Sequence, residues 1–200
     1  MLRFRAAHQY SLTKATMGLR SMVRTEGCAV EVSQRLKRAI TIINKLEREP
    51  NLALATMQDI GGCRALFGTI AELRRVEHRL KKNRPPLRYS DYITRPRSSG
   101  YRAVHVIVQY PDEWHEPRAI EVQLRTRTMH EWAIAIERLS GQHRVDLKSG
   151  QGPRELLDFM EAVSEAMAME EAGAAVPDHV MQRITELRAA AVPYLGRAPR

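Results

Sequence analysis

The stretch at residues 102–126 limits the fold most strongly, because two runs within it alternate apolar and polar side chains with the two-residue period of a β-strand. Each run places aliphatic side chains on one face and a mixed polar set on the other. On the polar face we expect Glu121, Gln123 and Arg125 of the second strand, with Tyr101, Ala103, His105 and Ile107 of the first. An antiparallel sheet with one solvated face gives the same pattern, so the alternation alone does not predict chemistry.

The other elements follow from helical periodicity and turn residues, and they predict an α/β (α+β mixed) fold, with a mixed central sheet flanked by helices. Helices are expected at 8–25, 30–48, 69–83, 127–140, 154–172 and 178–192, and strands at 60–67, 88–94, 102–110 and 119–126. The first 25 residues are rich in Arg and free of acidic residues, which also fits a transit peptide. We favour the amphipathic helix.

A polar, Gly-rich stretch at 141–153 predicts a linker that divides the chain into a body, 1–150, and a helical C-terminal extension, 151–200. The extension carries an apolar stripe at helical spacing: Leu156, Phe159, Met160, Val163 and Met167. Such a stripe must be covered by the body or by another subunit. We expect a homo-oligomer through the C-terminal helices.

Charge and composition narrow the classes of partner. The net charge is +9, yet residues 153–200 hold five Arg against eight acidic residues, so the extension carries −3 and the body +12. A basic body predicts a polyanionic partner such as a nucleotide, a nucleic acid or an acidic surface. No apolar run approaches the ~18 residues of a membrane span, so no membrane partner is expected. Cys28 and Cys63 lack metal-ligand spacing and favour a reducing, cytoplasmic location.

Two features suggest phosphate chemistry. In the expected helix 30–48, Leu36, Ile40 and Ile43 form the apolar stripe. Lys37, Thr41 and Lys45 recur every four residues, and Arg35 and Arg38 flank this line. Two like charges at this spacing repel, so a bound anion would stabilise them, although basic helix faces are also common on protein surfaces.

Asp59 is the second feature, because it stands at the start of the glycine-containing strand 60–67, where it is either a metal ligand or a solvated turn residue. The sequence has neither a Gly-x4-Gly-Lys-Ser/Thr loop nor a Cys/His cluster. A few carboxylates completed by phosphates and water are typical of Mg²⁺.

Four blocks, in order and at matching spacing, resemble the synthetase domain of the RelA/SpoT family, in the small stand-alone form. They are RLKRAITIINKL (35–46), DIGGCR (59–64), YITRPRSSGYRAVH (92–105) and EVQLRTRTMHEWA (121–133), which together span about residues 30–140. The resemblance implies a fold related to the nucleotidyltransferases of the polymerase-β type. It also implies synthesis of the alarmone (p)ppGpp, by transfer of pyrophosphate from ATP to the ribose 3′-hydroxyl of GDP or GTP.

The resemblance also assigns roles to residues of this chain. ATP would be bound by Arg35 and Arg64, which sandwich the adenine, and by Lys37, Thr41 and Lys45 at the phosphates. Asp59 and Glu121 would hold Mg²⁺; either is the candidate base, and His105 would contact a phosphate or shuttle the proton. The acceptor nucleotide would be bound by Arg97, Ser99, Tyr101, His105, Gln123, Arg125 and Ala133.

One departure from the family pattern leaves the acceptor open. Many members carry Lys-Pro-Asn-Gly-Tyr where this chain has Arg97-Ser98-Ser99-Gly100-Tyr101. The first alternative is therefore a toxin-like relative that acts on the tRNA 3′ end or makes adenine alarmones. A second alternative is a non-catalytic nucleotide- or RNA-binding module, which the pair Asp59 and Glu121 disfavours.

Overall fold

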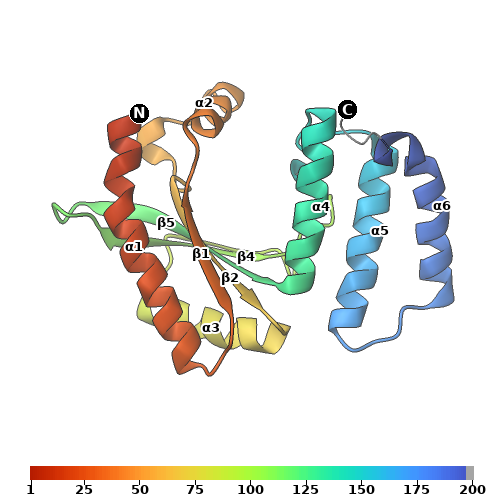
Figure 1. Ribbon diagram of the computed structural model, residues 1–200, viewed down its shortest axis with the longest axis horizontal. Coiled ribbons are helices and arrows are strands. Elements are labelled where there is room, and N and C mark those ends of the chain that lie inside the picture. Colours follow the sequence, from red (N-terminus) through yellow and green to blue (C-terminus); the bar gives the residue numbers. More distant parts are fainter. Residues whose placement is uncertain (197–200) are drawn as a thin grey trace. The chain divides into compact units, whose positions relative to one another are not determined.

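The computed structural model describes residues 1–196, in which a five-stranded mixed sheet is accompanied by six α-helices (Figure 1). The helices are α1 (Leu2–Thr25), α2 (Ala39–Arg48), α3 (Ile70–Asn83), α4 (Arg127–His143), α5 (Arg154–Glu171) and α6 (Asp178–Leu195). The strands are β1 (Glu31–Leu36), β2 (Gly61–Phe67), β3 (Arg88–Asp91), β4 (Val104–Pro111) and β5 (Pro117–Thr126). Two short 3₁₀ turns, η1 (Leu54–Thr56) and η2 (Leu147–Ser149), lie in the connections. The predicted α/β class is confirmed.

The strands lie in the order β1-β2-β5-β4-β3, so the two strands of the alternating stretch are neighbours in the middle of the sheet. β4 and β5 pair antiparallel, with Val104 opposite Leu124 and His105 opposite Gln123. β1 pairs antiparallel with β2, from Glu31 opposite Leu66 to Leu36 opposite Gly61. Residues opposite each other in these pairs project to the same face.

One face of this sheet is covered by helices and forms a hydrophobic core with them. The side chains of Val106, Ile120 and Val122 are at most 1 % exposed, and each contributes about 1.5–3 kcal/mol of burial free energy. α1 packs on this face closely enough that a Cβ added at Gly61 would lie 2.8 Å from Ile120 Cδ1 and 3.6 Å from Leu12 Cβ. α3, which begins at a capping box formed by Thr69 and Glu72, contacts α1 and β2. The predicted N-terminal helix is confirmed and is longer than expected.

The described chain divides into two compact units, each with its own core. The first comprises Met1–Ser90 and Val104–Arg125, and therefore most of the sheet with α1, α2 and α3. The second comprises Asp91–Ala103 and the chain from Thr126 onward, in which α4, α5 and α6 lie side by side (Figure 1). The core of the second unit includes Tyr101, Trp132, Leu147, Leu156 and Met160. The division at residue 150 remains a prediction from the sequence.

The helix predicted at 30–48 is wrong in its first half. Glu31–Leu36 forms β1, and the helix starts only at Ala39. β1 is an edge strand with mostly exposed side chains, so its sequence lacks the apolar alternation that marks a central strand. The predicted apolar stripe changes with it: Ile40 is 60 % exposed and Ile43 38 %, whereas Ile42 is fully buried.

Smaller differences arise at the ends of strands. β3 stops at Asp91 because the Asp91 Oδ1 atom accepts hydrogen bonds from the backbone amides of Ile93 and Thr94, which turns the chain. β4 begins at Val104, so Tyr101 and Ala103 precede the strand instead of lying on its polar face. Both are fully buried.

Two other sequence-based expectations concern the cysteines and the membrane. Cys28 and Cys63 are buried free thiols, and burial raises the pKa of Cys63 to about 12. Among the described residues, no helix combines the length and apolarity that crossing a bilayer requires.

Candidate active site

A row of polar side chains crosses β4 and β5 on the face opposite the α1 core. His105 Nδ1 lies 2.8 Å from Glu121 Oε1. Gln123 donates from Nε2 to Glu121 Oε2 at 2.6 Å, and Arg125 donates from Nη2 to Gln123 Oε1 at 3.1 Å. We call these four residues the polar row. The sequence predicted that Glu121, Gln123 and Arg125 share a face with His105, and the structure brings all four together.

The polar row is partly exposed at its acidic end. The side chains of His105 and Glu121 are 14 % and 17 % exposed, whereas Arg125 is buried. A carboxylate accepts hydrogen bonds but donates none, so His105 Nδ1 carries the proton between them.

Glu121 lies beside Gly62 of the neighbouring strand β2. A Cβ added at Gly62 would lie 3.5 Å from the Glu121 carbonyl oxygen and 3.9 Å from Glu121 Oε2. The β1–β2 register places Arg35 opposite Gly62 and Ser33 opposite Arg64. Arg35 and Arg64 therefore project to the same face as Gly62, beside Glu121. This placement is compatible with the prediction that the guanidinium groups of Arg35 and Arg64 hold the adenine of ATP between them.

Asp59 is held by two lysines in the segment that precedes β2. Lys37 Nζ lies 2.6 Å from Asp59 Oδ2, and Lys45 Nζ lies 3.2 Å from both carboxylate oxygens. Lys37 lies between β1 and α2, so the line of Lys37, Thr41 and Lys45 along a single helix was a wrong prediction. Pairing with Asp59 brings the two lysines together instead, while Thr41 is exposed on α2.

The sequence predicted the carboxylates of Asp59 and Glu121 as the protein ligands of Mg²⁺. Among the described residues, no group of three or more His, Cys, Asp or Glu side chains is arranged to hold a metal ion. Mg²⁺ is commonly bound by one or two carboxylates, with phosphates and water completing its six ligands. Two carboxylates match that number of protein ligands, although both oxygens of Asp59 are bonded to lysines here, and substrate phosphates would have to supply the remaining ligands.

The remaining predicted residues lie in the second unit, around the loop Arg97–Arg102, which we call the acceptor loop. Tyr101 is fully buried against Tyr92 and Trp132, at ring-centroid distances of 5.8 and 6.4 Å. Arg97 stacks on Tyr92, with its Cζ atom 4.6 Å from the ring centre, and lies 5.5 Å from the ring of Tyr101. Ala133 is fully buried in the same core.

Residues 147–149 also cover the acceptor loop, and sequence reasoning missed them. Lys148 Nζ lies 4.3 Å from the centre of the Tyr101 ring, and Ser99 Oγ donates to the carbonyl oxygen of Lys148 at 2.9 Å. The hydroxyl proposed to read the acceptor base is thus used inside the protein. The sequence placed Lys148 in the predicted linker 141–153 and gave no signal for this contact.

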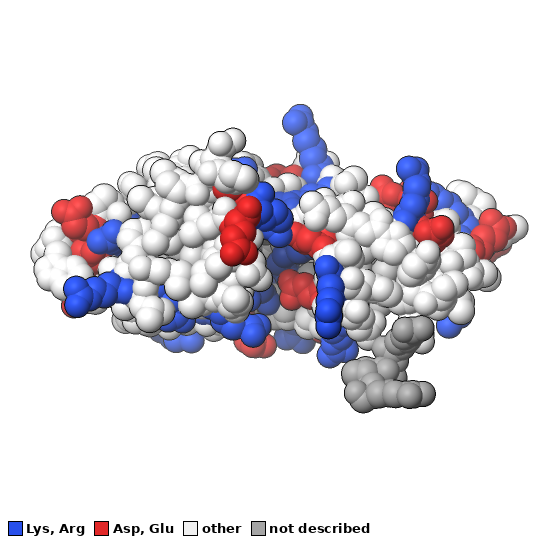
Figure 2. Space-filling model, turned by 90° about the horizontal axis from the view of Figure 1, so that it is seen from above, with Lys and Arg blue, Asp and Glu red and all other residues white. Residues whose placement is uncertain are grey.

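Charge is not segregated on the surface seen in Figure 2. Basic and acidic side chains are interspersed on that face, although the chain as a whole carries +9. Independently of this view, several basic groups of the first unit lie beside acids such as Glu26, Asp59 and Glu77. On this face, the net charge does not produce one continuous basic surface.

Comparison with known proteins decides the family. The family model described as "Region found in RelA / SpoT proteins" matches residues 34–139, which is more than half of the chain. The chain belongs to the RelA/SpoT family. The matched region contains the polar row, Asp59 with its two lysines and the acceptor loop, so the resemblance that the motifs predicted is confirmed.

Individual relatives agree with this assignment. The GTP pyrophosphokinase YjbM of Bacillus subtilis is 31 % identical over 145 residues, which cover 68 % of this chain and 65 % of YjbM. The GTP pyrophosphokinase of Escherichia coli strain K12 is 28 % identical over 56 % of this chain, but this stretch is only 15 % of that protein. The crystal structure of small alarmone synthetase 1 from B. subtilis, bound to its product pppGpp, matches with a TM-score of 0.73 at 23 % identity, covering 95 % of this chain and 97 % of that one. The predicted synthetase fold is confirmed.

Proposed function

We propose that this protein is an ATP:nucleotide 3′-pyrophosphotransferase that makes (p)ppGpp from ATP and GDP or GTP. The observation that carries the proposal is the polar row, in which Glu121 is bonded by both His105 and Gln123 on the exposed end of a sheet face. Arg35 and Arg64 project to the same face beside Gly62, where their planar guanidinium groups would hold a base between them. The pyrophosphokinase names of YjbM and the E. coli relative support the reaction class.

The reaction needs little covalent chemistry from the protein. The ribose 3′-oxygen of the acceptor attacks the β-phosphorus of ATP, the bond from that phosphorus to the oxygen bridging the α-phosphate breaks, and AMP leaves. Such transfers depend mainly on in-line positioning and on neutralising the phosphate charge. Lys37 and Lys45 supply two ammonium groups, which would move from Asp59 to the phosphates of ATP.

The 3′-hydroxyl proton requires an acceptor, and Glu121 is our candidate. His105 and Gln123 fix both of its oxygens, so the carboxylate is held in one orientation before the substrate arrives. When bound, Mg²⁺ would neutralise phosphate charge, held by Asp59 and Glu121. One carboxylate does not act as a tight ligand and a free base at once, so we leave the division between Glu121 and Asp59 to experiment.

For the acceptor, we propose that the base stacks on Tyr101, with Arg97 beside it. Tyr101 is fully buried in the structure, with Lys148 over its ring, so stacking requires the Lys148 side chain to swing away. A lysine side chain can do so at low cost because its long stem has many rotamers. Ser99, Gln123, Arg125 and Ala133 are proposed to contact the acceptor nucleotide as well.

The identity of the acceptor is tested by supplying each one in turn. The protein is incubated with Mg²⁺ and γ-labelled ATP, together with GDP, GTP, ADP, ATP alone or bulk tRNA, and the labelled products are separated by chromatography. We expect label in GDP and GTP. Label in tRNA, or in an adenine nucleotide that carries a new 3′-pyrophosphate, would establish the toxin-like alternative. No transfer of label to any acceptor would favour the binding module.

A further inference from the structure

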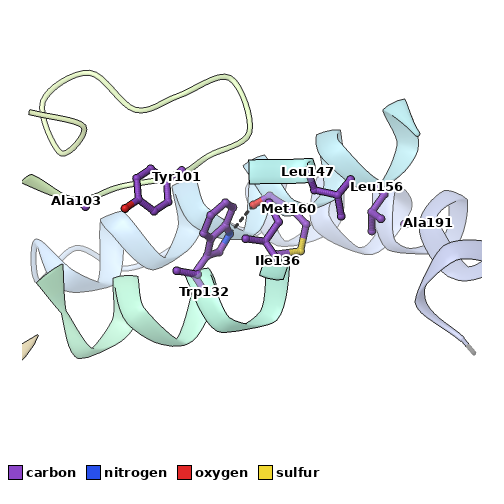
Figure 3. Close-up of a cluster of buried hydrophobic side chains, with 9 residues drawn as sticks. Tyr101, Ala103, Trp132, Ile136, Leu147, Leu156, Met160 and Ala191 are labelled. Atoms are coloured by element: carbon purple, nitrogen blue, oxygen red, sulfur yellow. Dashed lines mark hydrogen bonds between the residues drawn. The ribbon is translucent and has the colours of Figure 1, made fainter. Parts of the chain in front are cut away.

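The acceptor loop is built on a helix that lies outside the matched family region. α5 runs from Arg154 to Glu171, whereas the family model ends at residue 139. Figure 3 shows Tyr101 beside Trp132 and Met160, and the indole nitrogen Nε1 of Trp132 donates to the Met160 carbonyl at 2.9 Å. The loop and the helix therefore share one core within the second unit.

Gly100 brings the backbone of the acceptor loop into direct contact with α5. A Cβ added there would lie 2.9 Å from Glu161 Cα, 2.9 Å from Ser164 Cβ and 3.2 Å from the Met160 carbonyl oxygen. Gly100 also has a φ of +84°, a conformation that residues with a side chain rarely adopt. The glycine thus allows the loop to lie against the helix.

The Ser164 hydroxyl forms hydrogen bonds with the residues on either side of Tyr101. Its Oγ donates to the Gly100 carbonyl oxygen at 2.6 Å and accepts from Arg102 Nε at 3.2 Å. Ser164 is only 4 % exposed, so water does not compete for these bonds. One side chain of α5 therefore fixes the backbone before the tyrosine and the side chain after it.

Glu171, two turns further along the same helix, completes the arrangement. Its Oε2 lies 2.7 Å from Arg102 Nη1, with both side chains at most 10 % exposed, and Thr126 Oγ1 donates to its Oε1. A buried ion pair is sensitive to the loss of one partner, because the remaining charge is left without compensation. The pair holds Arg102 in a single orientation.

We propose that Ser164 and Glu171 are positioning residues for the acceptor nucleotide, which they serve by fixing Gly100 and Arg102 and thereby the ring of Tyr101. The inference rests on the proposed function, because it assumes that a nucleoside 5′-di- or triphosphate stacks on Tyr101. It extends the acceptor site from the matched family region into the C-terminal helices. ATP binding, assigned to residues of the first unit, does not depend on these contacts.

The test is steady-state kinetics with ATP and the acceptor varied separately. Ser164→Ala removes both hydroxyl bonds and is expected to raise the KM for GDP about tenfold, the scale of one net buried hydrogen bond, with the KM for ATP within about twofold. Glu171→Gln keeps an oxygen for Arg102 and is expected to have a smaller effect than Glu171→Ala. Glu165→Gln, on an exposed carboxylate of the same helix, is the matched control and should leave both KM values unchanged.

Amide hydrogen exchange gives a second readout that needs no activity. Ser164→Ala should speed exchange at residues 97–102 and leave β4 and β5 protected. Equal changes in both KM values, or unchanged exchange in the acceptor loop, would overturn the positioning role. A wild-type protein that transfers no pyrophosphate would overturn the proposed function instead, and the exchange experiment would still report whether α5 fixes the loop.

Discussion

Substitution of Glu121 by Gln is the sharpest test of the polar row, because the structure predicts both what it preserves and what it removes. The carboxylate now accepts from His105 at Oε1 and from Gln123 at Oε2. A glutamine amide offers one acceptor and one donor, so one of these bonds is lost unless a partner reorients. If the Gln123 amide flips, it gives up its bond from Arg125. If His105 instead takes the tautomer protonated at Nε2, its Nδ1 accepts from the new amide and both bonds are kept. At most about one hydrogen bond is therefore lost, which costs roughly 0.5–1.5 kcal/mol of unfolding free energy.

The effect on turnover should be far larger than this stability loss. Without a carboxylate to take the 3′-hydroxyl proton, we expect kcat to fall at least ~10²-fold, or ~2.7 kcal/mol of transition-state stabilisation. The assay is initial-rate formation of labelled product with saturating ATP and GDP, alongside urea denaturation of both proteins. Glu113→Gln, on an exposed carboxylate in the turn between β4 and β5, serves as the control and should change neither quantity.

The reasoning would be refuted by a Glu121→Gln protein that keeps kcat within about threefold of wild type, since a missing base should cost ~10²-fold. A second contrary result would be a collapse of the folded state, because the loss of one hydrogen bond does not unfold a domain whose stability is typically ~5–15 kcal/mol. The first result would remove Glu121 from the role of base, and the second would contradict the stability estimate for the polar row.

The other predictions concern the metal, the acceptor, acid stability and assembly. Asp59→Asn should raise the Mg²⁺ concentration needed for half-maximal rate, and an unchanged metal titration would argue against its role as a ligand. Tyr101→Ala should raise the KM for GDP by ~5-fold or more, since stacking on a base contributes ~1–3 kcal/mol, and an equal rise for ATP would mean that the pockets are wrongly assigned. Burial of Asp112 acts to raise its pKa, but hydrogen bonds from Arg118 and from nearby backbone amides outweigh it, so the pKa lies below its usual value. Because the folded pKa is lowered, the charged form stabilises the protein above pH ~4. The difference in Tm between wild type and Asp112→Asn should therefore shrink as the pH falls through the folded pKa, whereas a constant difference would contradict this. Light scattering of the full chain at micromolar concentration should give an oligomer mass, and a monomer mass would exclude assembly through the C-terminal helices.

The central sheet could be predicted from the sequence because its strands are buried on one face and polar on the other. The alternation in β4 and β5 predicted which residues share a face, whereas the register of His105 opposite Gln123 is known only from the structure. The same rule failed at Tyr101, because a two-residue period holds only within a strand and β4 begins three residues later. The site residues of the sheet were therefore predictable, and the surroundings of Tyr101 were not.

Tertiary contacts decide the parts that the sequence left ambiguous. Residues 31–36 carry few apolar side chains, so only pairing with β2 makes them a strand. The apolar stripe of α5 was predicted, and its Leu156 and Met160 are buried in the core of the second unit. The polar residues Ser164 and Glu171 gave no sequence signal, because a Ser and a Glu in a helix are ordinary surface residues until a distant loop contacts them.

The proposed reaction transfers the β- and γ-phosphates of ATP together, and a double-label experiment measures directly which phosphates are transferred. Parallel reactions with β-labelled and γ-labelled ATP, each with GDP and Mg²⁺, report whether both phosphates enter the product. We predict that the β label and the γ label enter the product equally and that removal of its 3′-pyrophosphate releases both. One AMP should form for each molecule of product. Incorporation of the γ label alone, with ADP as the second product, would contradict the account.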